Sequence, residues 1–241
     1  MTQKQGFKNK GHVRNAEAGS ALVYILIAIA LLAALTVSFM EPSSQQNQSQ
    51  NTFKTMSDLQ SQASFITSTV QECVLSHPGG DITIDNSLTG TDPGAKRRYP
   101  INPNSTHLPV ALRSGDHLVK NLRCPGNPGD SNNHQAIFGG TTGKFLPPPP
   151  PLFEDWKWYN GDDGVFFWTE TTKSDAYLQT ALAKLDNEYS KCEADVIDAR
   201  SGAVDMDSDT PDVANCPLGS TCFRVWMSLT ASAVHQDAGC P

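Results

Sequence analysis

The sequence lacks the short motifs that mark several common enzyme classes. It contains no G-x-S-x-G and no H-E-x-x-H, and Gly139-Gly140-Thr141-Thr142-Gly143 is not followed by the Lys-Ser or Lys-Thr of a phosphate-binding loop. Outside residues 1–19, the histidines lie in loop-like surroundings without a recognisable nucleophile: His77, His107, His117, His134 and His235. These absences argue against an enzyme. A membrane-anchored periplasmic hydrolase is kept only as an alternative.

Basic residues are also scarce. The chain has 18 Lys and Arg against 25 Asp and Glu, a formal charge of −7. Residues 1–19 contribute +3, from four basic residues and one Glu, so the remainder carries −7 − 3 = −10. An acidic surface opposes nucleic-acid binding as the main role. The one basic cluster, Lys96-Arg97-Arg98, is typical of a solvated loop.

Only one long apolar run is present. Ser20 to Met40 is 21 residues without a charge. As a helix rising ~1.5 Å per residue, such a run crosses the ~30 Å hydrocarbon core of a bilayer. Basic residues precede it, which predicts one membrane-spanning helix with the rest of the chain translocated. A cleaved secretory signal, with Thr36-Val37-Ser38 as the nearest cleavage site, and an uncleaved anchor stay open as alternatives.

The residues at the start of this run indicate which kind of membrane-directed segment it is. A basic leader ends at Gly19, Ser20 opens the run, and Pro42 follows it. This arrangement resembles the N-terminus of type IV pilins and type II secretion pseudopilins, over about residues 14–45. The resemblance implies cleavage by prepilin peptidase between Gly19 and Ser20, methylation of the new terminus, and a mature chain of 241 − 19 = 222 residues. It also implies a helix kink at Pro42.

The same resemblance implies a function and partners. Pilin-like proteins are structural subunits that assemble with other pilin-like subunits on an inner-membrane platform. The expected location is the bacterial inner membrane, single-pass, with the head in the periplasm or extracellular in an assembled pilus. Most pilins have Glu at the fifth mature residue, whereas this chain has Tyr24. An unpaired buried carboxylate costs energy, so Tyr24 favours a minor or tip subunit, as in K-type pseudopilins and X-type minor pilins.

Beyond the run, apolar residues recur at helical spacing. They follow one another in steps of three or four until His77-Pro78 stops the pattern: Met56, Leu59, Ala63, Ile66, Val70 and Cys73. The pattern predicts that the helix continues and that its second half lies against a head. The expected organisation is a leader at 1–19, a transmembrane and amphipathic helix at 20–77, and a globular head at 78–241.

The head is predicted to contain a small antiparallel sheet. Aromatic residues flank a Gly- and Asp-rich turn within Phe153–Glu170, which indicates a hairpin, and Phe223–Leu229 indicates a further strand. The aromatic face is expected to pack on the long helix, with a carbohydrate- or peptide-binding platform as the alternative. A second helix carries Leu178 and Leu182. The fold class is therefore α+β, a long membrane-spanning helix on a small sheet with a loop-rich insert.

Six cysteines lie in the predicted head and at the end of the long helix: Cys73, Cys124, Cys192, Cys216, Cys222 and Cys240. An even number in a translocated chain predicts a framework of three disulfides. Six cysteines allow fifteen pairings. We prefer Cys73–Cys124, Cys216–Cys222 and Cys192–Cys240, because bridges on each side of the loop-rich region restrict the unfolded chain. No C-x-x-C pair is present, which opposes a zinc site.

An acidic run, Asp205, Asp207, Asp209 and Asp212, is the one candidate metal site. Alternate carboxylates can wrap a calcium ion, and some pseudopilins bind calcium in a C-terminal loop. However, residue 210 is Thr where a calcium hand needs Gly, and no closing Glu follows. The pattern is more typical of a solvated acidic loop. No cofactor is expected, and calcium is the only metal kept as an alternative.

Overall fold

The structure is a computed structural model, which describes residues 18–81, 97–125, 134–208, 214–230, 233–235 and 239–240. Within the long N-terminal helix, side chains are described for residues 21–37 and again from residue 46. The chain divides into two compact units, residues 1–49 and 50–241.

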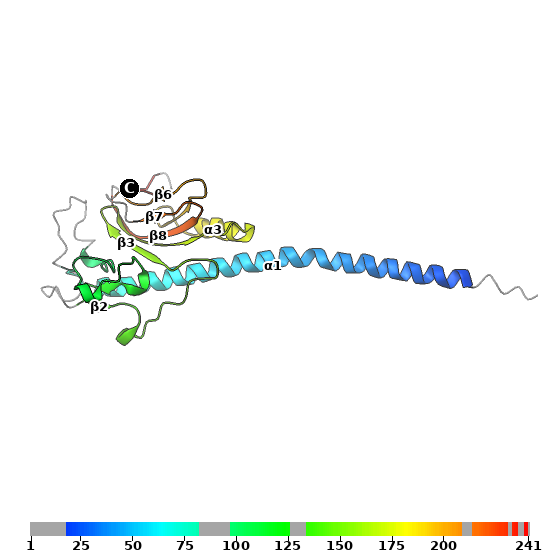
Figure 1. Ribbon diagram of the computed structural model, residues 1–241, viewed down its shortest axis with the longest axis horizontal. Coiled ribbons are helices and arrows are strands. Elements are labelled where there is room, and N and C mark those ends of the chain that lie inside the picture. Colours follow the sequence, from blue (N-terminus) through cyan, green and yellow to red (C-terminus); the bar gives the residue numbers. More distant parts are fainter. Residues whose placement is uncertain are drawn as a thin grey trace, which may run out of the picture. The chain divides into compact units, whose positions relative to one another are not determined.

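The second unit is built on a four-stranded antiparallel sheet in the order β3-β4-β8-β5 (Figure 1). Its strands are β3 (Lys157–Gly161), β4 (Gly164–Thr171), β5 (Ala194–Asp198) and β8 (Thr221–Leu229). Helix α3 (Ala176–Glu188) connects β4 to β5 and buries Leu178, Ala181, Leu182 and Leu185. The predicted α+β class and antiparallel sheet are confirmed.

Shorter elements surround this sheet. Two two-stranded ribbons pair β1 (Arg123–Cys124) with β2 (Gln135–Ala136), and β6 (Val204–Asp205) with β7 (Asn215–Cys216). The described part of the chain also has three short 3-10 helices, η1 (Val110–Leu112), η2 (Val119–Asn121) and η3 (Gly140–Thr142). The described residues between α1 and β3 are therefore mostly irregular, as their Gly- and Pro-rich sequence indicated.

Helix α1 (Ala18–Ser76) is 59 residues long. Within the second unit its predicted stripe is buried except at Met56, which is partly buried, and Leu59, Ile66 and Val70 are fully enclosed. They belong to one core cluster with Trp158, Phe167 and Phe223 of the sheet, and Figure 1 shows the cyan part of α1 beside β3 and β8. The period of 3.6 residues places the stripe on one side of the helix, which allows it to cover one face of the sheet.

Gln62 lies on the same buried side of α1. It binds a run of five prolines, Pro147–Pro151, to this helix. Its Nε2 donates to the Pro148 carbonyl at 2.7 Å, and its Oε1 accepts from Trp156 Nε1 at 2.7 Å. Both functions of the amide are used, so burial of Gln62 leaves no unpaired polar atom in this side chain. The Pro147–Pro151 segment is thereby fixed at one carbonyl to the helix.

The aromatic hairpin has two buried faces, whereas one was expected. Trp158 and Phe167 face the α1 core, while Tyr159, Phe166 and Trp168 belong to a second cluster. Because side chains alternate along a strand, consecutive aromatic residues must enter opposite layers. Residues of the β6–β7 ribbon and Trp226 complete the second cluster. A second apolar layer thus covers the sheet face that a one-sided aromatic pattern leaves to solvent.

The predicted membrane-spanning helix is wrong. Within the described residues, none of the helices is both long enough and apolar enough to cross a bilayer. Side chains are described at the 17 residues 21–37, of which 16 are apolar and Thr36 is polar. The expected span also counted residues 38–40, whose side chains lie outside the described part. The predicted location, a single pass through the inner membrane, is wrong for the same reason.

Candidate functional site

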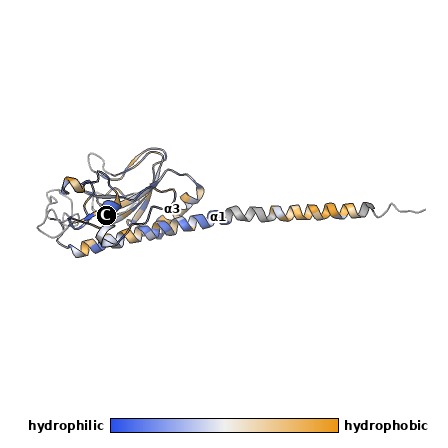
Figure 2. Ribbon diagram, turned by 60° about the horizontal axis from the view of Figure 1, so that its bottom comes forward, coloured by the Kyte–Doolittle hydropathy of each residue, from blue (hydrophilic) through white to orange (hydrophobic). Residues whose placement is uncertain are grey.

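The N-terminal part of α1 carries an unusual surface. Eleven large apolar side chains between Leu22 and Val37 are each 50 to 70% exposed, and Figure 2 shows this hydrophobic end of the helix in orange. They are Leu22, Val23, Tyr24, Ile25, Leu26, Ile27, Ile29, Leu31, Leu32, Leu35 and Val37. We call residues 22–37 the exposed apolar segment. Exposed apolar patches of this extent mark interaction surfaces in proteins.

The exposed apolar segment is apolar on all sides. Leu31 and Leu32 are neighbours in sequence and therefore point about 100° apart on the helix, yet they are 63% and 67% exposed. No charged residue lies between Ser20 and Met40. A helix with apolar residues all round requires cover on every side, rather than on one face as in the second half of α1.

The predicted processing residues lie at the beginning of this helix. Gly19 and Ser20 are within α1, and the Ser20 side chain is outside the described part of the structure. The leader up to residue 17 is also outside them. Backbone around residue 42 is helical, but the Pro42 ring is not described, so the kink stays a prediction.

The six cysteines form three bridges: Cys73–Cys124, Cys192–Cys240 and Cys216–Cys222. These are the pairs preferred from the sequence. Cys73–Cys124 joins the last turn of α1 to β1, and Cys192–Cys240 joins the loop before β5 to the C-terminal residues. Each of these two bridges connects segments about 50 residues apart, which restricts the unfolded chain.

His77 lies beside the Cys73–Cys124 bridge, a relationship the sequence analysis missed. Its Nδ1 is 3.1 Å from Cys124 Sγ and 3.3 Å from the Cys73 carbonyl oxygen. The ligand atoms of Cys73, His77 and Cys124 lie within 4.8 Å of one another. Both sulfurs are in the disulfide, so neither is a thiolate able to ligate a metal. The C-x-x-x-H spacing at the helix end was the available signal, since residues four apart share a helix face.

The acidic run is only partly described. Asp209 and Asp212 lie outside the described residues. The Asp205 carboxylate accepts a hydrogen bond from the Asp207 N–H at 3.2 Å, and the buried Asp207 carboxylate accepts from the Ala214 N–H. Both carboxylates therefore bind backbone donors of their own loop. The calcium site stays a prediction.

A cavity of about 350 Å³ is lined by residues that include His117, Asp116, Lys157 and Trp168. Burial lowers the pKa of His117, the nearby Asp116 raises it, and Lys157 lowers it. The Asn104 amide is 2.8 Å from His117 Nε2, and the Lys157 ammonium is 2.9 Å from Glu170 Oε1. The histidine and the lysine are thus each held by a neutral or acidic partner, and among the described lining residues none is a serine, threonine or cysteine nucleophile.

No family model, no curated protein and no solved structure matches this chain.

Proposed function

We propose that this chain is a structural subunit of the type IV pilin kind, in a minor or initiating role. The observation that carries the proposal is the exposed apolar segment on α1, with eleven large apolar side chains open to solvent. Its proposed occupant is the same segment of further pilin-like subunits. A helix that is apolar all round fits the centre of a bundle of like helices.

The energetics favour such assembly. Full burial of one Leu, Ile or Val side chain contributes about 1.5–3 kcal/mol, so covering the exposed apolar segment supplies a strong attraction. No charge lies in residues 20–40 to oppose close approach. The second half of α1 is already covered by the sheet of its own head. This supports different roles for the two parts of the chain. The first half of α1 binds other subunits, and the head determines which partners are bound.

Three residues carry the finer part of the proposal. The Gly19–Ser20 junction is the proposed processing site, which would make Ser20 the first residue of the assembled subunit. Tyr24, 70% exposed, is a neutral residue at a place where pilins carry a buried Glu. A subunit at the tip has no following terminal amine to pair with a carboxylate, so Tyr24 supports a minor or priming position.

Site-specific photo-crosslinking of the full chain in its native host tests the assembly surface. A photoreactive phenylalanine analogue at Ile29 is expected to give crosslinks to pilin-like partners. The matched control is the same analogue at Gln60, which is exposed on the same helix but within the second unit. Equal crosslinking at both positions, or none at Ile29, would contradict the proposal.

Intact mass of the protein from cells tests the processing site separately. A chain beginning at methylated Ser20 is expected, and Gly19→Leu is expected to leave the leader attached. A mature terminus within residues 36–40 would instead support a secretory signal. A chain that keeps residues 1–19 in the wild type would overturn processing while leaving the assembly surface testable.

A further inference from the structure

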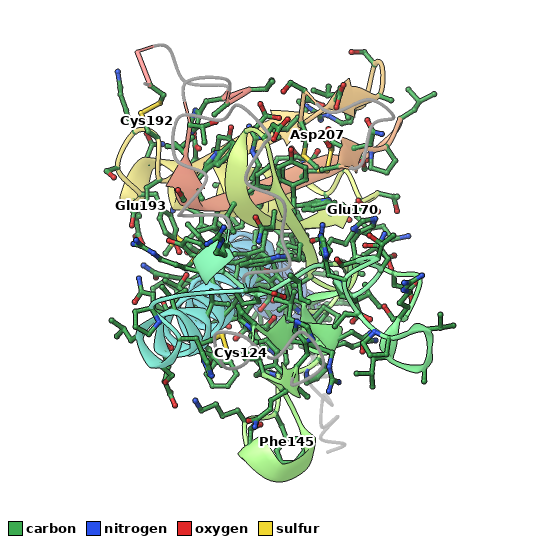
Figure 3. The ribbon with its side chains drawn as sticks, turned by 90° about the vertical axis from the view of Figure 1, so that its left-hand side faces the viewer. Cys124, Phe145, Glu170, Cys192, Glu193 and Asp207 are labelled. Carbon is green, nitrogen blue, oxygen red and sulfur yellow. A yellow bond between two sulfur atoms is a disulfide. The ribbon has the colours of Figure 1, made fainter. Side chains whose placement is uncertain are left out.

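The disulfide between Cys73 and Cys124 has a hydrogen-bond donor placed at one of its sulfurs. Nδ1 of His77 is 3.3 Å from the Cys73 carbonyl oxygen and 3.1 Å from Cys124 Sγ. A carbonyl oxygen only accepts hydrogen bonds, so Nδ1 of His77 carries the hydrogen. The same N–H is therefore available to Cys124 Sγ. Figure 3 shows Cys124 below the sheet, beside the end of α1.

The other two bridges have a different environment. Cys216 and Cys222 are 0% exposed within the second core, where the nearby polar groups are the Ser220 hydroxyl and the Ile197 carbonyl. Cys192 and Cys240 are half-buried and hence more accessible. Among the described residues, no ring nitrogen is hydrogen-bonded to a sulfur of either bridge. Exposure alone therefore predicts that Cys192–Cys240 is the first of the three bridges to react with a thiol.

A cavity of about 130 Å³ reaches the Cys73–Cys124 bridge. Its lining includes both cysteines, His77 and the ion-paired Glu72 and Lys144. A space of this size admits the terminal CH₂–SH of a small thiol. Cys73 and Cys124 are each 7% exposed, so the bridge is not sealed in the core.

We propose that Cys73–Cys124 is a thiol–disulfide exchange site with His77 as its catalytic residue. The thiolate of an incoming small thiol attacks Cys73 Sγ, forming a mixed disulfide there while the bond to Cys124 Sγ breaks. Cys124 leaves as a thiolate, stabilised by the His77 Nδ1–H, and takes up the proton that the incoming thiol released. The net reaction consumes one thiol and one disulfide and yields one mixed disulfide and one thiol.

Opening this bridge removes the covalent connection between the end of α1 and β1. It leaves the incoming group on the helix residue Cys73, so the exchange serves as a reversible attachment point for a thiol-bearing partner. This exchange does not depend on the proposed assembly role, because its residues all lie in the second unit.

Brief exposure of the full, folded protein to reduced glutathione, followed by trapping with N-ethylmaleimide and peptide mass analysis, tests the proposal. Cys73–Cys124 is expected to open before Cys192–Cys240, with glutathione on Cys73 and the trapping reagent on Cys124. First opening at Cys192–Cys240, or glutathione on Cys124, would overturn it.

The role of His77 is tested separately, by whether its substitution slows or accelerates opening of the bridge. His77→Ala is expected to slow opening of the bridge about tenfold, because a hydrogen bond to a developing charge is lost. Mere loosening of the helix end would accelerate opening instead. His77→Gln, which keeps an N–H donor, is expected to recover part of the rate, and His107→Ala is the matched control. An unchanged or faster rate in His77→Ala would refute the role, and the position of glutathione in the wild type decides the proposal if that variant does not fold.

Discussion

Asp195 on β5 and Arg224 on β8 are register partners whose side chains form a two-point ion pair inside the second core. The guanidinium donates from Nε to Oδ1 at 2.9 Å and from Nη2 to Oδ2 at 2.6 Å. It also donates to the carbonyls of Met206 and Val234, and lies 4.5 Å from the Trp226 ring centroid. A single buried cation therefore connects the sheet, the loop after β6 and the C-terminal residues.

Removing the charge of Asp195 is expected to be strongly destabilising. Asp195→Asn leaves the buried Arg224 cation without its counter-charge, and breaking such a pair costs about 3–5 kcal/mol in free energy of unfolding. Urea denaturation monitored by tryptophan fluorescence measures it. Asp198→Asn is the matched control, because Asp198 lies on the same strand but pairs with Arg200 at the surface. A loss no larger than in this control would show that the buried pair contributes little.

Gly164 at the start of β4 is expected to tolerate no side chain. Its φ is +127°, and a Cβ there would lie 2.1 Å from the Ser228 carbonyl oxygen on the neighbouring strand. Gly164→Ala is expected to lower the free energy of unfolding by at least about 2 kcal/mol, since backbone strain adds to the clash. Gly202→Ala, with open space around it, serves as the comparison in the same urea experiment. Similar midpoints for both variants would contradict the described packing of β4 on β8.

The three disulfides are expected to differ in their contribution to stability. In the chain-entropy relation, a bridge spanning 51 residues such as Cys73–Cys124 restricts the unfolded chain by about 4 kcal/mol. The bridge spanning 6 residues, Cys216–Cys222, restricts it by about 2 kcal/mol. Thermal unfolding of the two double-alanine variants checks the order. The reverse order would mean that burial of Cys216–Cys222 in the second core outweighs loop entropy.

His117 is expected to remain neutral to a lower pH than an ordinary histidine. Burial lowers its pKa below 6.5, against an opposing effect of Asp116. Because the folded state binds its proton less readily, the associated stability is present above pH 6.5 and is lost as the pH falls through the folded pKa. NMR titration of the imidazole measures the pKa directly. Lys157→Gln should raise it and Asp116→Asn should lower it further; shifts of opposite sign would refute this electrostatic assignment.

The spacing of residues close together in the sequence predicted much of the secondary structure of the second unit. The stripe of Leu59, Ile66 and Val70 followed from helical spacing, and the turn at Asp162-Asp163 followed from Gly and Asp between aromatic residues. Both signals depend on residues within a few positions of one another, which is the range over which backbone geometry repeats. The buried face of α1 could therefore be predicted from the sequence alone.

The candidate sites were less predictable. The exposed apolar segment was correctly seen as one unbroken apolar run, but its assignment as a membrane span was wrong. The proximity of His77 to Cys124, 47 residues apart, depends on how α1 meets β1. Likewise, neither Asp195 nor Arg224 has a local signal, because a charge is stable in a core only where a distant segment supplies its partner.

By itself, the sequence determined the period and length of α1, the hairpin, the acidic charge and the even number of cysteines, since each depends on composition or short-range spacing. Only the tertiary structure decided which faces of the sheet are covered, which buried charges are paired and which disulfide has an imidazole beside it. These features arise where segments far apart in the chain meet, and the free energy of such contacts is set by packing and desolvation in three dimensions.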